Sequence, residues 1–191
     1  MKNKKNIENM ENSIEEGKKI DLRKEIFSWV MVFVIAWCVA FLLSRFIVIN
    51  AKIPTESMDD TIEVGDKVFG FRLSYLFSDP KRGDIIMFDA PNKEDTIYIK
   101  RLIGLPGDTI KIKDNVLYIN GEEYKEDYVD SWYNSIGEYE YTLGDDEYFM
   151  MGDNRDHSTD SRAWGPISKD AMIAKAIFKY KIIPFKLKNL Y

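Results

Sequence analysis

Two residues far apart in the sequence, Ser57 and Lys100, have the types needed for acyl transfer. A serine hydroxyl is a weak nucleophile and needs a nearby base to accept its proton. Lysine has an unperturbed pKa of about 10.4, so it serves as a base at neutral pH only where burial lowers that pKa. Lys100 lies in the apolar segment 97–103, where a strand would place Tyr98 and Leu102 on its own face and isoleucines on the other. These residues therefore indicate a Ser–Lys dyad.

Other interpretations of these residues stay open on this evidence. The single histidine, His157, would have to be the base of any Ser-His-Asp triad, but its polar surroundings are typical of a solvated loop. Lys100 could instead be an edge-strand lysine that discourages aggregation. Ser78 and Lys81 fit the S-x-x-K pattern of penicillin-binding enzymes, yet the S-D-N and K-T-G motifs that accompany it do not occur in the sequence.

The oxyanion formed in acyl transfer needs hydrogen-bond donors that are already in place. The backbone N–H of Ser57 is the natural first donor. The hydroxyl of Thr55 is the expected second donor if the turn, which Pro54 stiffens, folds back on itself. We therefore expect the oxyanion hole to be built from residues 55–57.

The polar segment 152–162, GDNRDHSTDSR, is the second candidate for the site. A calcium loop would need oxygen ligands at alternate positions, where arginine and histidine occur instead, so no metal is expected. A scaffold for the dyad fits better. The hydroxyl of Ser158 can hydrogen-bond and aim a neutral lysine amine, while Asp160 and Arg162 can form a supporting ion pair.

Residues 26–44, IFSWVMVFVIAWCVAFLLS, carry no charge. A helix of this length spans about 28 Å, close to the hydrocarbon thickness of a bilayer at about 30 Å. A cleaved leader fits less well because no small-residue cleavage site follows, and a buried core helix would need a polar face. Basic residues before the run outnumber those after it, which favours a cytoplasmic N-terminus. They are Lys18, Lys19, Arg23 and Lys24 before it, and Arg45 and Lys52 after it.

The remaining sequence predicts a mainly β protein. Residues 1–25 are polar and read as a disordered cytoplasmic tail, 26–44 as a transmembrane signal anchor, and 45–191 as an extracytoplasmic catalytic β domain. Short β-type runs separated by turn residues predict an antiparallel sheet, with a small β-ribbon insert at 109–146. Strands are expected at 67–71, 84–88, 96–99, 109–112, 116–119, 147–151 and 171–183.

Composition narrows the possible partners. The net charge is −5 and no basic patch is interleaved with aromatic residues, so nucleic acid is not an expected partner. The only cysteine, Cys38, lies within the apolar run, which excludes an intramolecular disulfide and argues against a cysteine protease.

Four motifs in this order resemble the bacterial type I signal peptidases, in their compact Gram-positive form. They lie at 54–58, 82–86, 100–108 and 152–162, behind the apolar segment. The resemblance implies a largely antiparallel β fold and an endopeptidase without cofactor or metal. It assigns Ser57 as nucleophile, Lys100 as general base, Thr55 to the oxyanion hole, Ser158 as the residue that orients the lysine, and Asp160 with Arg162 as the supporting pair.

The same resemblance implies cleavage of preprotein signal peptides after small residues, by an enzyme anchored in membrane lipid. An extended substrate would pair with segments containing Ile53, Ile97, Tyr98 and Ile99. Two positions depart from the family pattern: Asp60 stands where proline is usual, and His157 where asparagine is frequent. Two alternatives are a self-cleaving, repressor-like Ser–Lys protein and an inactive homologue that acts as an assembly chaperone. A spanning helix in place of a DNA-binding head argues against the first, and the presence of both dyad residues argues against the second.

Overall fold

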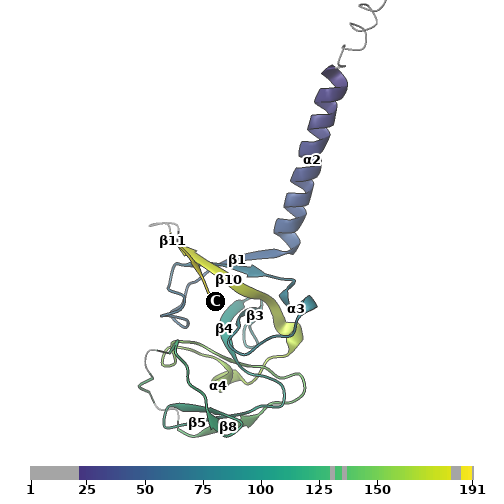
Figure 1. Cartoon of the computed structure of the whole chain (residues 1–191). Coiled ribbons are helices and arrows are strands. Elements are labelled where there is room, and N and C mark those ends of the chain that lie inside the picture. Colours follow the sequence, from purple (N-terminus) through teal and green to yellow (C-terminus); the bar gives the residue numbers. More distant parts are fainter. Residues whose placement is uncertain (1–21, 130–131, 135–136, 182–185, 191) are drawn as a thin grey trace, which may run out of the picture. The chain divides into compact units, whose positions relative to one another are not determined.

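The computed structural model describes residues 22–129, 132–134, 137–181 and 186–190. The chain divides into two compact units, Met1–Ser44 and Arg45–Tyr191. The mainly antiparallel β architecture with an N-terminal apolar helix confirms the predicted fold class. Figure 1 shows the helix α2 and the strands of the second unit.

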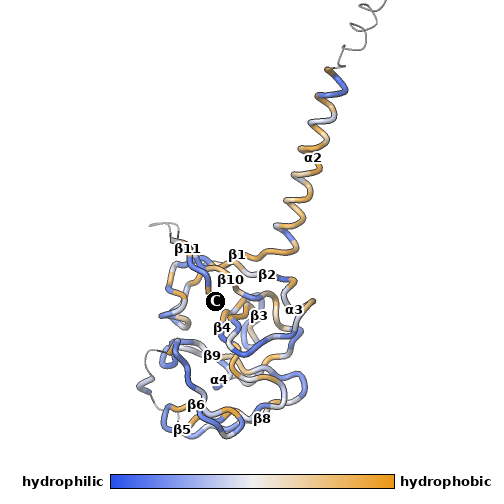
Figure 2. Tube along the Cα trace, in the orientation of Figure 1, coloured by the Kyte–Doolittle hydropathy of each residue, from blue (hydrophilic) through white to orange (hydrophobic). Residues whose placement is uncertain are grey.

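Helix α2 (Leu22–Phe46) contains the predicted apolar run and extends beyond it at both ends. It is long and apolar enough to cross a membrane, and Figure 2 shows its hydrophobic character along most of its length. Residues 22–25, expected in the disordered tail, form its first turn because leucine, arginine, lysine and glutamate are good helix formers. The rest of the predicted tail, residues 1–21, lies outside the described residues.

The main sheet is antiparallel, and the order of its strands is β1-β2-β10-β3-β4-β9, with β11 paired to β10. Its strands are β1 (Val48–Lys52), β2 (Lys67–Phe71), β3 (Ile85–Asp89), β4 (Ile97–Gly104), β9 (Phe149–Met151), β10 (Met172–Lys181) and β11 (Lys186–Asn189). All the strands expected here are present, although residues 182–183 of the last one are outside the described residues. Strand β1 was not predicted, and β4 continues five residues beyond the expected end at Ile99.

A second, four-stranded sheet has the order β7-β6-β5-β8. It consists of β5 (Thr109–Lys113), β6 (Val116–Ile119), β7 (Glu122–Glu123) and β8 (Tyr139–Thr142). The tight turn between β5 and β6 works because Asp114 and Asn115 adopt positive φ angles of 50° and 62°, which these residue types tolerate. Apolar residues of the insert form their own core with β9, including Ile110, Leu117 and Phe149.

Two four-residue helices interrupt the β structure: α3 (Ser74–Phe77) and α4 (Ser161–Trp164). Asp160 caps α4, because its side chain accepts a hydrogen bond from the backbone N–H of Arg162. The core of the main sheet gathers buried side chains from several strands and from the loop after β1. Its members include Ile53, Met58, Ile62, Val68, Ile85, Met87, Ile99 and Ala174.

Candidate active site

Lys100 lies in the middle of β4, opposite Ile86 of β3. Only 5% of the residue is exposed, so the interpretation as a solvated edge-strand lysine does not hold. Burial lowers the pKa of Lys100 from 10.5 to about 8, which outweighs the opposing effect of the Asp160 and Asp153 carboxylates. The guanidinium of Arg162 adds to the lowering. A substantial fraction of this lysine is therefore neutral at mildly alkaline pH.

Ser57 is presented by a closed loop after β1. The backbone N–H groups of Ile53 and Gly65 donate to Asp66 and Ile53 respectively, each at 2.9 Å, and so fix the base of the loop. The Ser57 residue is 8% exposed. Its hydroxyl is hydrogen-bonded to Lys100 Nζ and lies 3.3 Å from the hydroxyl of Thr55. The fold thus joins the two candidate dyad residues, 43 positions apart, and adds the hydroxyl expected for the oxyanion hole.

The single histidine does not take part in this contact. The hydrogen-bond partners of the Ser57 hydroxyl among the described residues are Lys100 and Thr55. His157 is exposed, and its backbone N–H donates to the carbonyl of Asn154 within the loop. The geometry therefore gives no support to a triad based on His157.

The 152–162 segment packs against the backbone of Ser57. The backbone N–H of Asn154 donates to the Ser57 carbonyl at 3.3 Å. A Cβ atom added to Gly152 would lie 2.3 Å from that carbonyl oxygen and 2.2 Å from the hydroxyl oxygen of Ser158, so only glycine permits this close approach. Asp160 stabilises the arrangement by accepting a hydrogen bond from the Gly152 N–H at 3.0 Å.

The expected ion pair between Asp160 and Arg162 is present, with 2.7 Å between Oδ1 and Nε and both side chains buried. Ser158 also lies in the site, next to Gly152. Its hydroxyl, however, has no hydrogen-bond partner within the described part of the chain, so the expected bond to the lysine amine does not form in this structure. The lysine Nζ is hydrogen-bonded to Ser57.

A groove of about 360 Å³ runs past the dyad. It is lined by the dyad residues and by all four side chains expected to contact substrate, namely Ile53, Ile97, Tyr98 and Ile99. Strand β4 pairs with β3 from Ile97 onward, but its pairing with β9 begins only at Arg101. Among the described residues, no strand pairs with the other edge of residues 97–99, which borders the groove.

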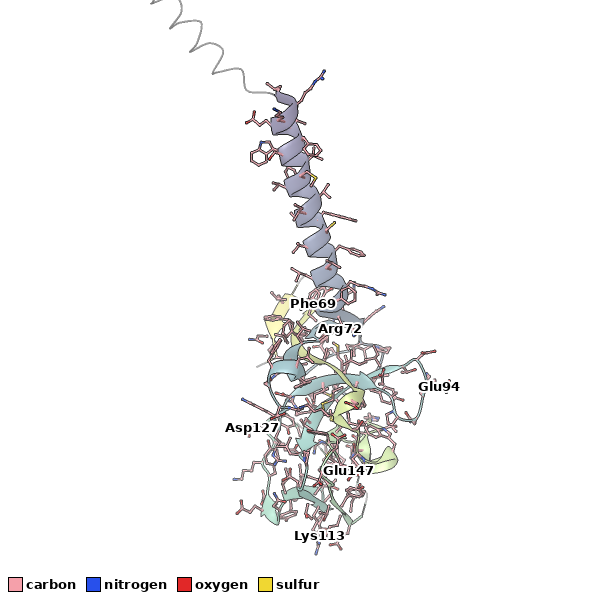
Figure 3. All side chains as sticks on the ribbon, turned by 90° about the vertical axis from the view of Figure 1, so that its right-hand side faces the viewer. Phe69, Arg72, Glu94, Lys113, Asp127 and Glu147 are labelled. Atoms are coloured by element: carbon pink, nitrogen blue, oxygen red, sulfur yellow. The ribbon has the colours of Figure 1, made fainter. Side chains whose placement is uncertain are left out.

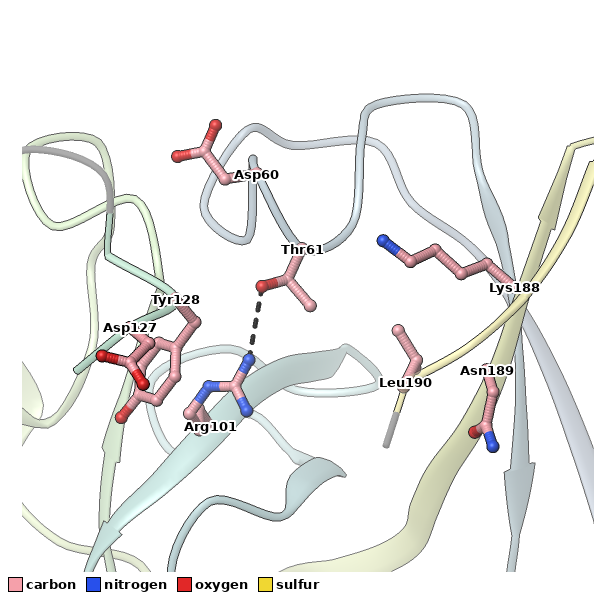
Figure 4. A pocket seen from close by; sticks show the side chains of 8 residues that line it. All are labelled: Asp60, Thr61, Arg101, Asp127, Tyr128, Lys188, Asn189 and Leu190. Atoms are coloured by element: carbon pink, nitrogen blue, oxygen red, sulfur yellow. Dashed lines mark hydrogen bonds between the residues drawn. The ribbon is translucent and has the colours of Figure 1, made fainter.

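A buried polar cluster on the opposite face of β4 was not foreseen from the sequence. Arg101 forms two hydrogen bonds to the Asp153 carboxylate, at 2.8 and 2.6 Å. The Thr61 hydroxyl donates to Asp153 at 2.5 Å. It also accepts a hydrogen bond from the Arg101 guanidinium at 3.3 Å, and Figure 4 marks this second bond. An arginine beside Lys100 and an aspartate beside Gly152 were visible in the motifs, but no sequence rule pairs residues that are 52 positions apart.

No group of His, Cys, Asp or Glu side chains suited to a metal ion occurs within the part of the chain that the structure describes.

Comparison with known proteins identifies the family of the chain. Residues 26–181 match the family model described as "Signal peptidase, peptidase S26". The chain is 32% identical over 178 residues to signal peptidase IB of Staphylococcus aureus (strain COL), covering 83% of this chain and 91% of that protein. It is 36% identical over 156 residues to signal peptidase I of Bacillus licheniformis, covering 77% and 83%.

The chain belongs to the signal peptidase family S26. It is accordingly a serine endopeptidase of the signal peptidase type, and its N-terminal apolar helix fits a membrane-anchored protein. A solved signal peptidase I from Enterococcus faecalis V583 is 33% identical, covers 51% of this chain and 97% of its own chain, and has a TM-score of 0.47.

Proposed function

We propose that this signal peptidase cleaves preprotein signal peptides with Ser57 as the nucleophile and Lys100 as the general base. The observation that carries the proposal is the hydrogen bond between the Ser57 hydroxyl and a buried lysine amine with a lowered pKa. With a pKa of about 8, roughly a tenth of the lysine is neutral at pH 7, against less than a thousandth for an unperturbed lysine.

In the proposed mechanism, neutral Lys100 takes the hydroxyl proton as Ser57 Oγ attacks the scissile carbonyl carbon. The Ser57 N–H and the Thr55 hydroxyl stabilise the resulting oxyanion. The protonated lysine then gives its proton to the departing amine, which leaves an ester on Ser57. Lys100 finally activates a water molecule that hydrolyses this ester and restores the free serine.

The substrate would bind in the groove as an extended strand. Its backbone would pair with the open edge of residues 97–99 on one side and with the segment around Ile53 on the other. Alternate substrate side chains would then face the enzyme, which links the first and third positions before the cut. Ile53 and Ile99 are buried in the sheet core and would form the floor of shallow pockets, which favours small side chains there.

The supporting residues would act by positioning the two residues of the dyad. Asp160 and Arg162 would hold the 152–162 segment against Ser57, and Ser158 would accept a hydrogen bond from the lysine amine when the dyad contact opens during turnover. We further propose that residues 26–44 anchor the chain in lipid, with residues 1–25 cytoplasmic and the catalytic unit, residues 45–191, outside. The excess of basic residues before the apolar run supports this orientation.

Substitutions test the assignment directly. Ser57→Ala and Lys100→Ala should each abolish cleavage of a preprotein by the detergent-solubilised full chain, with unchanged circular dichroism, because the dyad acts as a unit. His157→Ala is the matched control and should keep most activity. An inactive His157→Ala together with an active Lys100→Ala would show that the base has been assigned wrongly.

A further inference from the structure

One segment of the insert contacts the buried arginines around the dyad. We call it the strap: residues 126–129 and 132–134. The strap residue Glu126 binds Arg155 through both carboxylate oxygens, at 2.5 and 2.6 Å, and the Arg155 side chain is fully buried. Arg155 Nε in turn donates to the Gly152 carbonyl at 3.0 Å. The ion pair is therefore one hydrogen bond away from the glycine that packs against Ser57.

The strap also covers the arginine next to the catalytic lysine. The ring of Tyr128 lies 3.8 Å from the Arg101 guanidinium carbon, and the two side chains are drawn together in Figure 4. The Tyr128 hydroxyl donates to Glu126 at 2.6 Å. Burial, reinforced by the neighbouring Glu126 carboxylate, raises the pKa of Tyr128 well above its usual range, so the hydroxyl keeps its proton and remains a donor.

Further contacts attach the strap to the 152–162 segment. The ring of Trp132 lies 5.2 Å from the Arg155 guanidinium and 5.5 Å from that of Arg162. The backbone N–H groups of Tyr133 and Asn134 both donate to the Asp156 carboxylate at 2.9 Å. The strap thus contacts three arginines and one aspartate, all of which belong to β4 or to the 152–162 segment.

We propose that the strap keeps Ser57 and Lys100 correctly placed relative to each other. Glu126 and Tyr128 are then positioning residues for this dyad. Glu126 acts through Arg155 and Gly152 on the backbone of Ser57. Tyr128 covers the side chain of Arg101 on the face of β4 that is opposite to Lys100. This inference rests on the proposed dyad. It implies that loosening the strap admits water to Lys100 and raises its pKa, because burial is the largest cause of the lowered value.

The first test is Glu126→Gln in the full chain, with cleavage followed from pH 6 to 10. We expect kcat to fall roughly 10- to 100-fold because small misplacements of reacting groups are costly, with KM changed less than about twofold. The pH midpoint should move upward. Glu126→Asp should recover part of the lost kcat and should show a smaller shift of the pH midpoint than Glu126→Gln. The matched control, Glu140→Gln, removes an exposed ion pair with Lys111 in the same insert and should leave both unchanged.

Tyr128 provides a second test that does not remove a buried charge. Tyr128→Leu removes the ring over Arg101 and should raise the pH midpoint, whereas Tyr128→Phe keeps the ring and should shift it less. An unchanged midpoint in both Glu126→Gln and Tyr128→Leu, with any loss of activity matching the loss of folded protein, would overturn the inference while leaving the dyad intact. A wild-type chain that does not cleave, or a Ser57→Ala variant that does, would instead overturn the proposed function.

Discussion

Replacing Lys100, the proposed general base, should make this protein more stable while abolishing its activity. In Lys100→Met an apolar side chain of similar length takes the place of an amine that the fold keeps out of water. The wild-type chain holds this amine at a pKa of about 8, against 10.5 for an unperturbed lysine, as in an unfolded chain. Burying the protonated lysine therefore lowers the free energy of unfolding. The Lys100→Met variant has no charge to bury, so this penalty is absent from it.

The pKa difference sets the size and the pH range of the effect. At 1.36 kcal/mol per pKa unit, the wild-type penalty is about 3 kcal/mol at pH values below 8. Because the folded-state pKa is lowered, the unfolded chain binds more protons between pH 8 and 10.5, and wild-type stability rises with pH across this window. Loss of the hydrogen bond to Ser57 costs about 1 kcal/mol. The net gain expected for Lys100→Met is thus about 2 kcal/mol at pH 7. It should fall to zero at about pH 10, where the remaining penalty equals the loss of the hydrogen bond, and reverse sign above that pH.

The assay is urea unfolding of the full chain in detergent, followed by tryptophan fluorescence at several pH values. Lys113→Met is the control, because this exposed lysine lies at the outer end of the insert, as Figure 3 shows. Its unfolding free energy should match the wild type at every pH. A Lys100→Met variant that is less stable than wild type at pH 7, or whose advantage does not depend on pH, would refute the argument from desolvation.

Three further outcomes are expected. In substrates with Ala, Val, Leu or Phe at the first and third positions before the cut, kcat/KM should be highest with Ala; efficient cleavage with Phe or Leu immediately before the cut would contradict shallow pockets. Asp160→Asn should destabilise the chain by about 3–5 kcal/mol, because it leaves buried Arg162 unpaired, whereas Asp79→Asn, which removes an exposed pair, should not. Asp60 has a φ of 78°, which proline cannot adopt, so Asp60→Pro should lower the urea midpoint, and Asp60→Gly should retain it.

Local patterns in the sequence predicted most of the architecture. The uncharged apolar run indicated α2, and alternating runs between turn residues indicated the strands, since side-chain periodicity follows directly from backbone geometry. Strand β1 was missed because Val48–Lys52 is short and directly follows the apolar helix. The open edge of β4 could not be foreseen either, because it depends on where the β9 partner ends.

In the candidate site, likewise, features set by local sequence were predicted and those set by the tertiary fold were not. Residue types and motif order pointed to Ser57 and Lys100, and the apolar neighbours of Lys100 predicted its burial. The pairs Arg101–Asp153 and Glu126–Arg155 were not predicted, because each joins residues that only the tertiary fold brings together. The bond expected between Ser158 and the lysine amine is not formed among the described residues, because a sequence does not specify the distances between side chains that the fold sets.

The pH dependence of kcat/KM tests the central claim, that a neutral Lys100 is the base for Ser57, most directly. Cleavage of a peptide substrate by the full chain should be measured from pH 5 to 10.5, so that the profile reports the free enzyme. Because the deprotonated lysine is the active form, kcat/KM should rise with pH and reach half of its maximum near pH 8. A midpoint near 10.4, the value of a solvated lysine, or a flat profile from pH 5 to 9 would contradict the account.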